Sequence, residues 1–353
     1  MATGVRRWST GVVRVLISVL FMLWIGAAVI SSHAQQPKQS ELTVKIDTDL
    51  VVSDALVVSK KTGRVIGDLK PEDFLLYEDG VRQEITHFSQ DKLPLSIMLL
   101  LDVSGSVRPK LQQVQAGARY AMEQLKTEDE VAVMVFAGGA KLIQDFTKDR
   151  QLIEDKIAGI EDNQLGFRGQ FGTRINEGVY QAAAHMDQAT NPQSRRVIIG
   201  VTDNKSSAIP TGHSGGDALE QLFESGSVVC GLIVESEIFG GIFGKASSTV
   251  GTLLGRIDSF ADKTGGEVMK AKREEIANKL VELIGRLRTR YTLGYAPANS
   301  NLDGKFRKLD LKVTPQVEAR EGKVVVRTRQ GYYARRLVQA DDKYGKQSRP
   351  EEK

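Results

Sequence analysis

The feature that most constrains the fold is a nearly continuous apolar run, LSIMLLLD at residues 95–102, which ends in a carboxylate. Central strands of parallel sheets show this pattern because helices cover both of their faces. A second apolar run, RVIIGVTD at residues 196–203, also ends in an aspartate, and segments with helical spacing separate these and further runs up to about residue 271. Strands that alternate with helices of about ten or more residues predict a parallel α/β sheet.

We expect the helices of this region to lie on both faces of the sheet, in a doubly wound arrangement. Pro109 favours the first turn of the first helix, where the N–H that proline lacks would have no partner. The last helix carries one apolar stripe that includes Ile276, Leu280 and Ile284. The expected elements are a strand pair over 130–138 and 141–146 and helices over 107–125, 149–160, 173–187 and 273–290.

The segments on both sides of this region have the shorter period of β-strands. Residues 42–90 predict a small N-terminal β module, in which Asp79-Gly80 lies between two strand-like runs and indicates a hairpin. Residues 286–336 predict a C-terminal β extension packed on or beside the central region. The remaining segments are a polar linker over 35–41 and a charged, disordered tail over 337–353.

The first 34 residues have the order of a secretory signal peptide. Two arginines precede an apolar stretch over 15–30, and small residues lead to Ala34. We predict cleavage after Ala34 and a protein that works outside the cytoplasm, either periplasmic or secreted. The alternative is an uncleaved membrane anchor, because apolar residues before Arg14 could lengthen the span.

Charge and composition exclude several classes of protein. The 48 basic and 44 acidic residues give a net charge of +4, and removing the three arginines of residues 1–34 leaves +4 − 3 = +1. A nearly neutral chain gives no support to nucleic-acid binding. The one cysteine, Cys230, excludes a cysteine-based zinc site, and the four histidines lie too far apart for metal-ligand spacing.

One segment is locally basic, because residues 286–336 hold thirteen Lys and Arg against four Asp and Glu. In KFRKLDLKV, over 305–313, the alternation places most of the charges on the solvated face of a strand. The alternative interpretation is a contact with an anionic envelope polymer or a membrane surface.

Oxygen-bearing side chains gather where the predicted parallel strands end. Asp102, Ser104 and Ser106 lie at the end of the first strand, Asp203 ends the second, and Thr173 opens a predicted helix. In open α/β sheets, ligands bind outside the carboxyl ends of the strands. Two carboxylates and three hydroxyls suit a hard cation such as Mg²⁺. Helix capping and turn formation are the alternative roles for the serines and for Asp203.

A known family has such residues in the same order. The metal-ion-dependent adhesion site of the von Willebrand factor type A domain resembles Asp102-Val103-Ser104-Gly105-Ser106, followed by Gly172-Thr173 and Thr202-Asp203. The resemblance covers about residues 94–285 and implies a Rossmann-like fold.

The resemblance also implies the chemistry of the site. Its ligands to Mg²⁺ or Mn²⁺ would be Asp102, Ser104, Ser106 and Thr173, with Asp203 bound directly or through water. In that family an acidic side chain of a partner protein completes the coordination. Asn204 departs from the pattern, because glycine often follows the aspartate, but it touches no ligand and we expect the site to survive.

The flanks, over 51–88 and 290–336, are similar to a bacterial exported subfamily called VWFA-related. We therefore expect an exported protein without enzymatic activity, whose cation binds an Asp or Glu of an unidentified partner in adhesion or envelope-complex assembly. Two alternatives are open. One is a metal-free scaffold of the envelope. The other is a Mg²⁺-dependent phosphoesterase, which would need a general base besides the carboxylates already used as ligands.

Overall fold

A computed structural model describes residues 50–160, 172–207, 212–235 and 255–334. The predicted signal peptide 1–34, the linker 35–41 and the tail 337–353 lie outside the described residues. Within the described ranges, no helix is both long enough and apolar enough to cross a membrane.

The central region forms a six-stranded sheet in the described residues, as the alternating apolar runs predict. Its strands, in order across the sheet, are β10 (Val268–Ala271), β9 (Val228–Val234), β8 (Arg195–Thr202), β5 (Leu95–Asp102), β6 (Glu130–Phe136) and β7 (Ala140–Thr147). The sheet is parallel except for β7, which pairs with β6 in antiparallel register. Every residue of β5 and β6 is buried, which explains their continuous apolar sequences.

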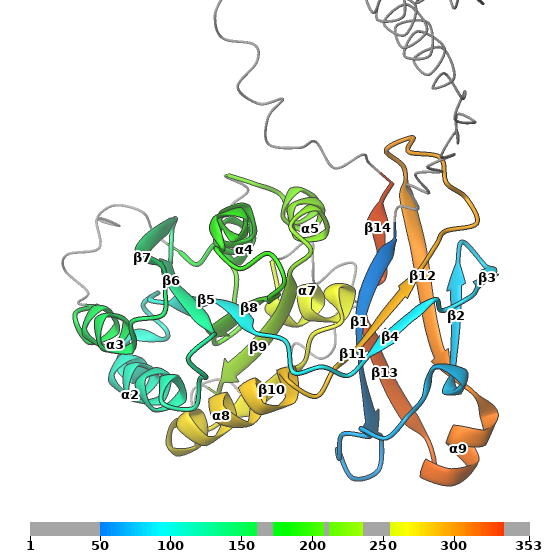
Figure 1. The fold of residues 1–353 in the computed structure, drawn as a ribbon. Helices are drawn as coiled ribbons and strands as arrows, with labels where there is room; N and C mark the ends of the chain where they lie inside the picture. Colours follow the sequence, from blue (N-terminus) through cyan, green and yellow to red (C-terminus); the bar gives the residue numbers. More distant parts are fainter. Residues whose placement is uncertain (1–49, 161–171, 208–211, 236–254, 335–353) are drawn as a thin grey trace, which may run out of the picture. The chain divides into compact units, whose positions relative to one another are not determined.

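Helices lie on both faces of this sheet (Figure 1). One face is covered by α2 (Leu111–Met122), α3 (Arg150–Ala158) and α8 (Ile276–Leu287), and the other by α4 (Ile175–His185), α5 (Gly215–Glu224) and α7 (Ile257–Thr264). These two layers confirm the predicted doubly wound, Rossmann-like class. The first helix begins later than expected, because Pro109 lies in a 3₁₀ turn over Arg108–Lys110.

The remaining strands form a β-sandwich, two four-stranded sheets around one apolar core in the described residues. Core side chains come from both sheets, among them Val57 and Tyr291 from the first and Leu76 and Leu311 from the second. The first sheet has the order β13 (Val324–Thr328), β1 (Val51–Ser59), β11 (Tyr291–Tyr295) and β4 (His87–Ser89), and the second has the order β14 (Gly331–Tyr333), β12 (Phe306–Val313), β2 (Phe74–Glu78) and β3 (Val81–Gln83).

The β-sandwich differs from the organisation expected from the sequence. We expect a β module at 42–90 and a separate β extension at 286–336, whereas strands of the two segments share both sheets. Each segment contributes two strands to each sheet, and two strands alone cannot form a stable sheet with a covered apolar face. The two segments therefore complete one core together.

Two local features of the β-sandwich follow from turn and helix chemistry. The predicted hairpin is confirmed, because β2 and β3 pair in antiparallel register and the turn residues Asp79 and Gly80 have φ angles of 48° and 84°. Positive φ at both positions is typical of a type I′ turn. A helix that the sequence does not lead us to expect, α9 (Pro315–Glu321), begins at a proline after β12 and buries Val317.

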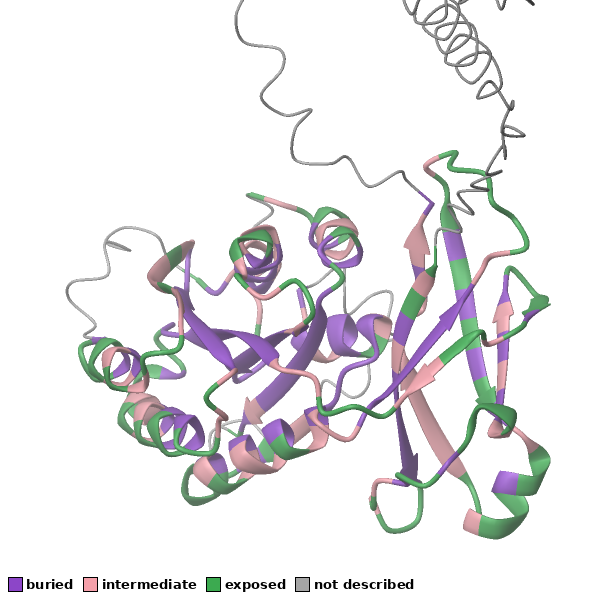
Figure 2. Cartoon of the chain, in the orientation of Figure 1, coloured by how far each residue is buried: buried purple, intermediate pink, exposed green. Residues whose placement is uncertain are grey.

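The basic segment 286–336 uses its charges in two ways. Along β12 buried and exposed residues alternate (Figure 2), so that Lys308, Asp310 and Lys312 face solvent as predicted. The arginines depart from this expectation, because Arg290 and Arg307 are buried. Part of the basic charge is therefore inside the protein rather than on a solvated face.

Buried arginines connect the β-sandwich to the central domain. Arg195, the first residue of β8, donates through Nε to Asp54 Oδ2 on β1 at 2.6 Å. Its guanidinium also donates to the carbonyl of Leu287, at the end of α8, at 2.6 Å. Arg290 donates to the carbonyl of Gly265, after α7, at 2.7 Å. Arg195 therefore joins β1 to β8 and to the end of α8, and Arg290, just before β11, joins the sandwich to the residue after α7.

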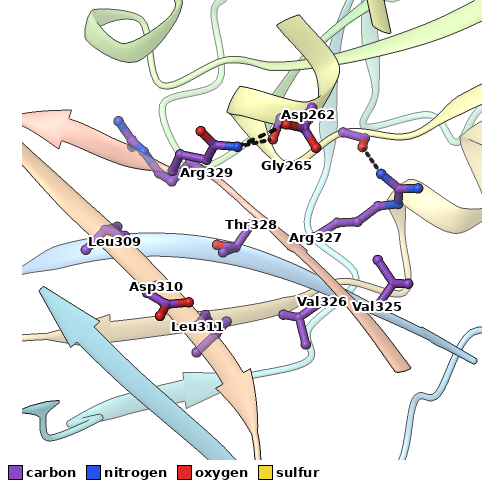
Figure 3. Close-up of a pocket in the computed structure, with 12 residues that line it drawn as sticks. Asp262, Gly265, Leu309, Asp310, Leu311, Val325, Val326, Arg327, Thr328 and Arg329 are labelled. Carbon is purple, nitrogen blue, oxygen red and sulfur yellow. Dashed lines mark hydrogen bonds between the residues drawn. The ribbon is translucent and has the colours of Figure 1, made fainter. Parts of the chain in front are cut away.

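A small cavity of about 180 Å³ lies between the end of α7 and strands β12 and β13 (Figure 3). At its edge, Arg327 donates to the carbonyl of Gly266 at 3.4 Å. Gly265 has a φ of 79°, and a Cβ at this position would lie 2.4 Å from the backbone carbon of Thr328. The close approach of α7 to β13 therefore requires glycine.

We predict that Arg195→Met lowers the free energy of unfolding by about 3 kcal/mol or more. The substitution removes the basic partner of Asp54, whose side chain is 19% exposed, and leaves it only the hydrogen bond from Thr292 among its described side-chain partners. Arg196→Met is the matched control, because Arg196 pairs with the exposed Asp187 and its loss should cost about 1 kcal/mol or less. Urea unfolding of both variants provides the measurement. Equal losses would show that the Arg195 contact is no stronger than a surface ion pair.

Candidate metal centre

Asp102 is the most deeply buried of the predicted ligands. It ends β5, and the parallel register with β8, in which Leu101 is paired with Val201, brings Thr202 to the same edge of the sheet. The Thr202 hydroxyl donates to Asp102 Oδ2 at 2.6 Å, and the N–H of Ser104 donates to Asp102 Oδ1 at 2.9 Å. Both carboxylate oxygens are therefore oriented by neighbouring groups.

The two serines lie in the turn that follows Asp102. The carbonyl of Ser104 accepts from the N–H groups of Val107 and Arg108 at 3.0 Å each, which directs the chain into the 3₁₀ turn before α2. The hydroxyls of Ser104 and Ser106 are 3.3 Å apart. Ser104 is buried and Ser106 is exposed, so the pair of hydroxyls leads from Asp102 to the surface.

Thr173 is held against the loop that follows β8. Its N–H donates to Ser207 Oγ at 2.8 Å, and its carbonyl accepts from the N–H of Ser207 at 2.8 Å. Gly172 makes this contact possible, because it has a φ of 99° and a Cβ there would lie 2.5 Å from Ser207 Oγ. The structure thus joins the loop of Thr173 to the loop of Asp203.

Asn204 occupies a backbone conformation that favours glycine, with a φ of 60°. Asparagine tolerates this region better than most residues. Its Oδ1 accepts from the N–H of Ile257, the first residue of α7, at 2.7 Å. The side chain is therefore engaged with α7, which accounts physically for a residue other than glycine at this position.

The predicted site residues differ in how closely the structure brings them together. Hydrogen bonds link Asp102 to Ser104 and Ser104 to Ser106, and Asp203 acts on Asp102 through its charge. Thr173 is connected to the loop of Asp203 through Ser207. The sequence analysis assigns no role to Ser207 or to the Thr202 hydroxyl. The polar residues that follow the apolar run of β8 are the signal that could have placed them near the site.

One carboxylate oxygen at this edge lacks a hydrogen bond. Asp203 Oδ2 is buried and receives none from the described residues, while Lys205 Nζ lies 3.7 Å away. A buried carboxylate oxygen without a donor costs free energy, which a cation would recover. Carboxylates and hydroxyls are ligands that a hard divalent cation prefers. The residues present therefore fit the divalent cation that the sequence predicts.

Nitrogen and sulfur ligands are not part of this arrangement. The described part of the chain holds no group of three or more His, Cys, Asp and Glu side chains that could bind a metal ion. A metal centre at this edge would therefore depend on serine and threonine hydroxyls in addition to Asp102 and Asp203.

Burial also changes the acidity of the site. The pKa of Asp102 is raised to about 6, mainly by burial and to a smaller extent by the negative charge of Asp203, against the hydrogen bonds from Ser104 and Thr202 that lower it. Two carboxylates share a space with little water, so one of them holds its proton more tightly than usual. A bound cation would reverse this effect.

A second carboxylate fixes the neighbouring loop. Glu177 on α4 accepts from the N–H of His213 at 3.0 Å and lies 2.9 Å from its Nδ1, and the His213 ring stacks on Tyr180. Burial opposes ionisation here, but the hydrogen bonds from His213 and Gln181 lower the pKa of Glu177. Glu177 therefore stays ionised near neutral pH and holds His213 against α4.

One family model matches part of the chain. The family model of the von Willebrand factor type A domain matches residues 97–205, which include all five predicted ligands. The chain therefore contains a von Willebrand factor type A domain. A comparison with curated proteins finds no match.

Solved structures with low sequence identity also align with the chain. Proximal thread matrix protein 1 from the mussel byssus is 16% identical, with a TM-score of 0.43 over 57% of this chain and 49% of that protein. The chain thus spans about half the length of the mussel protein. Another structure of the mussel protein has a MIDAS motif occupied by zinc. The protein BatB from Bacteroides thetaiotaomicron is 17% identical, with a TM-score of 0.40 over 54% of this chain and 99% of that protein.

We predict that Asp102→Asn stabilises the protein in the presence of a chelator at neutral pH. The pKa of Asp102 is about 6 in the folded state against 3.8 in the unfolded chain, so the folded state binds more protons between these values. The free energy of unfolding therefore falls by about 3 kcal/mol as the pH rises from about 4 to 7. The asparagine side chain carries no charge at any of these pH values, so the variant should not show this fall.

Urea unfolding of both proteins at several pH values measures the effect. The variant should exceed the wild type in stability above pH 6, and the difference should shrink toward pH 4. Parallel pH profiles for the two proteins would rule out a destabilising charge at Asp102.

Proposed function

We propose that this chain is an exported binding protein whose von Willebrand factor type A domain uses a divalent cation to capture a carboxylate of a partner protein. The observation that carries the proposal is the buried Asp203 Oδ2, which receives no hydrogen bond from the described residues and forms a long ion pair with Lys205 at 3.7 Å. The residues that would hold Mg²⁺ or Mn²⁺ are Asp102, Ser104, Ser106, Thr173 and Asp203. When bound, the cation would supply a Lewis-acidic anchor for an Asp or Glu side chain.

The arrangement of charges favours binding over catalysis. Asp102 and Asp203 are the carboxylates at the end of β5 and β8, and both are assigned to the cation, so neither is available as a general base. Von Willebrand factor type A domains are mainly interaction modules. Adhesion or the assembly of an envelope complex is the setting we propose, supported by the signal-peptide pattern of residues 1–34.

We predict that the chelator-treated wild-type chain binds Mg²⁺ and Mn²⁺ in a calorimetric titration and that Asp203→Asn weakens binding by at least about tenfold. The loss of one anionic ligand is the physical reason. Asp187→Asn is the control, because Asp187 is an exposed aspartate that pairs with Arg196 away from this site. Equal affinities of the wild type and Asp203→Asn would remove Asp203 from the ligand set.

A further prediction concerns the open coordination position. Excess acetate should tighten the binding of Mn²⁺ to the wild-type chain, because a free carboxylate would take the place of the partner side chain. Chloride at the same ionic strength is the control. If neither metal binds even with acetate present, the chain acts as a metal-free scaffold and the proposal fails.

A further inference from the structure

A basic hollow of about 450 Å³ lies at one end of the β-sandwich, where β1 ends and β13 begins. Antiparallel pairing brings its two sides together, because the N–H of Lys60 donates to the carbonyl of Lys323 at 2.9 Å. The turn after β1 supplies the rest of its wall. The residues of the basic hollow used below are Lys60, Lys61, Thr62, Arg64, Glu321 and Lys323.

The positive charges of the basic hollow are not balanced. Lys60, Lys61 and Lys323 are exposed, and no carboxylate among the described residues pairs with them. Glu321, the one acid in the lining, pairs with Arg64 at 2.8 Å and with the neighbouring Arg320 at 3.0 Å. Three ammonium groups around one space repel each other, and an anion placed among them would relieve this repulsion.

Some other lysines of the β-sandwich and the central domain have acidic partners, whereas Lys92, Lys141 and Lys148 are exposed and have none among the described residues. Lys312 pairs with Asp310 at 2.8 Å, and Lys279 pairs with Glu282 at 2.8 Å. The basic hollow is distinguished by position, because three lysines without an acidic partner among the described residues line one space. They come from both ends of the chain, so the segment 286–336 alone does not define the surface.

The lining favours phosphate groups of a polymer over a membrane surface. Lysine is a common point-charge ligand of phosphate. Thr62 Oγ1 accepts from the N–H of Arg64 at 3.3 Å, which leaves the hydroxyl proton free to donate. The exposed large apolar side chains of the described residues lie elsewhere, for example at Val81 and Tyr120, so the hollow has no group that would enter a bilayer.

We propose that the basic hollow binds a linear, phosphate-bearing polyanion, independently of the candidate metal centre. Lys60, Lys61 and Lys323 would contact successive phosphates, and the Arg64–Glu321 pair would limit the affinity by withholding one cation. Such binding would hold the protein on an anionic polymer of the envelope while the other domain captures its partner.

The test uses the full chain and a short-chain polyphosphate as the probe, with binding followed by calorimetry in a chelator. The triple variant Lys60→Gln, Lys61→Gln and Lys323→Gln should bind at least about tenfold more weakly and show a smaller dependence on salt. The matched control changes Lys92, Lys141 and Lys148, all exposed and outside the hollow, to Gln. It should stay within about twofold of the wild type, because binding depends on position and not on net charge.

A second variant should change the affinity for polyphosphate in the opposite direction. Glu321→Gln removes the acidic partner of Arg64 and of Arg320 and should strengthen polyphosphate binding by a few-fold, a result that misfolding would not produce. Equal losses in the two triple variants, or no binding by the wild type, would overturn the proposal. Binding to phosphatidylglycerol vesicles without binding to polyphosphate would overturn it in favour of a membrane surface. Inorganic phosphate alone should bind weakly, since it engages fewer lysines at once.

Discussion

A carboxylate buried at the end of a central strand organises the domain that carries the proposed function. Asp102 is placed there by the same apolar run that builds β5, and no basic side chain pairs with it in the described residues. The protein instead surrounds it with donors from the chain itself, the hydroxyl of Thr202 and the N–H of Ser104. These uncharged donors orient the carboxylate but do not neutralise it. The neighbouring loops therefore surround a negative charge that no basic side chain of the described residues balances.

Buried positive charges, by contrast, lie at the boundary between the two domains. Arg195 and Arg290 are buried where the β-sandwich meets the central domain. Arg195 donates to Asp54 and to the carbonyl of Leu287, and Arg290 donates to the carbonyl of Gly265. A planar guanidinium with several donors suits this role better than lysine does. Arginines therefore connect the two domains, whereas the unpaired lysines stay at the surface in the basic hollow.

Much of the central domain could be predicted from the sequence, because its signals are local. The apolar run of β5 with its terminal carboxylate and the Asp79-Gly80 turn each specify their own structure within a few residues. The β-sandwich could not be predicted in this way, since the pairing of Ala55 with Thr328 depends on side chains more than two hundred residues apart. At the site, Ser207 escaped notice because it acts through its contact with the backbone of Thr173, and a sequence does not show which loops touch.

The strand pairing of the β-sandwich has a consequence for how the chain folds. Because Ser89 of β4 pairs with Thr292 of β11, the whole central domain is inserted between two adjacent strands, and its first and last residues leave the sandwich side by side. The central domain can form from its own contacts while synthesis proceeds from the N-terminus. β1, by contrast, must wait for β13 at the far end of the chain before its sheet closes. A chain that stops before β12 would keep a folded central domain but expose the apolar faces of β1 and β2, so premature termination should yield an aggregating product rather than a smaller working one.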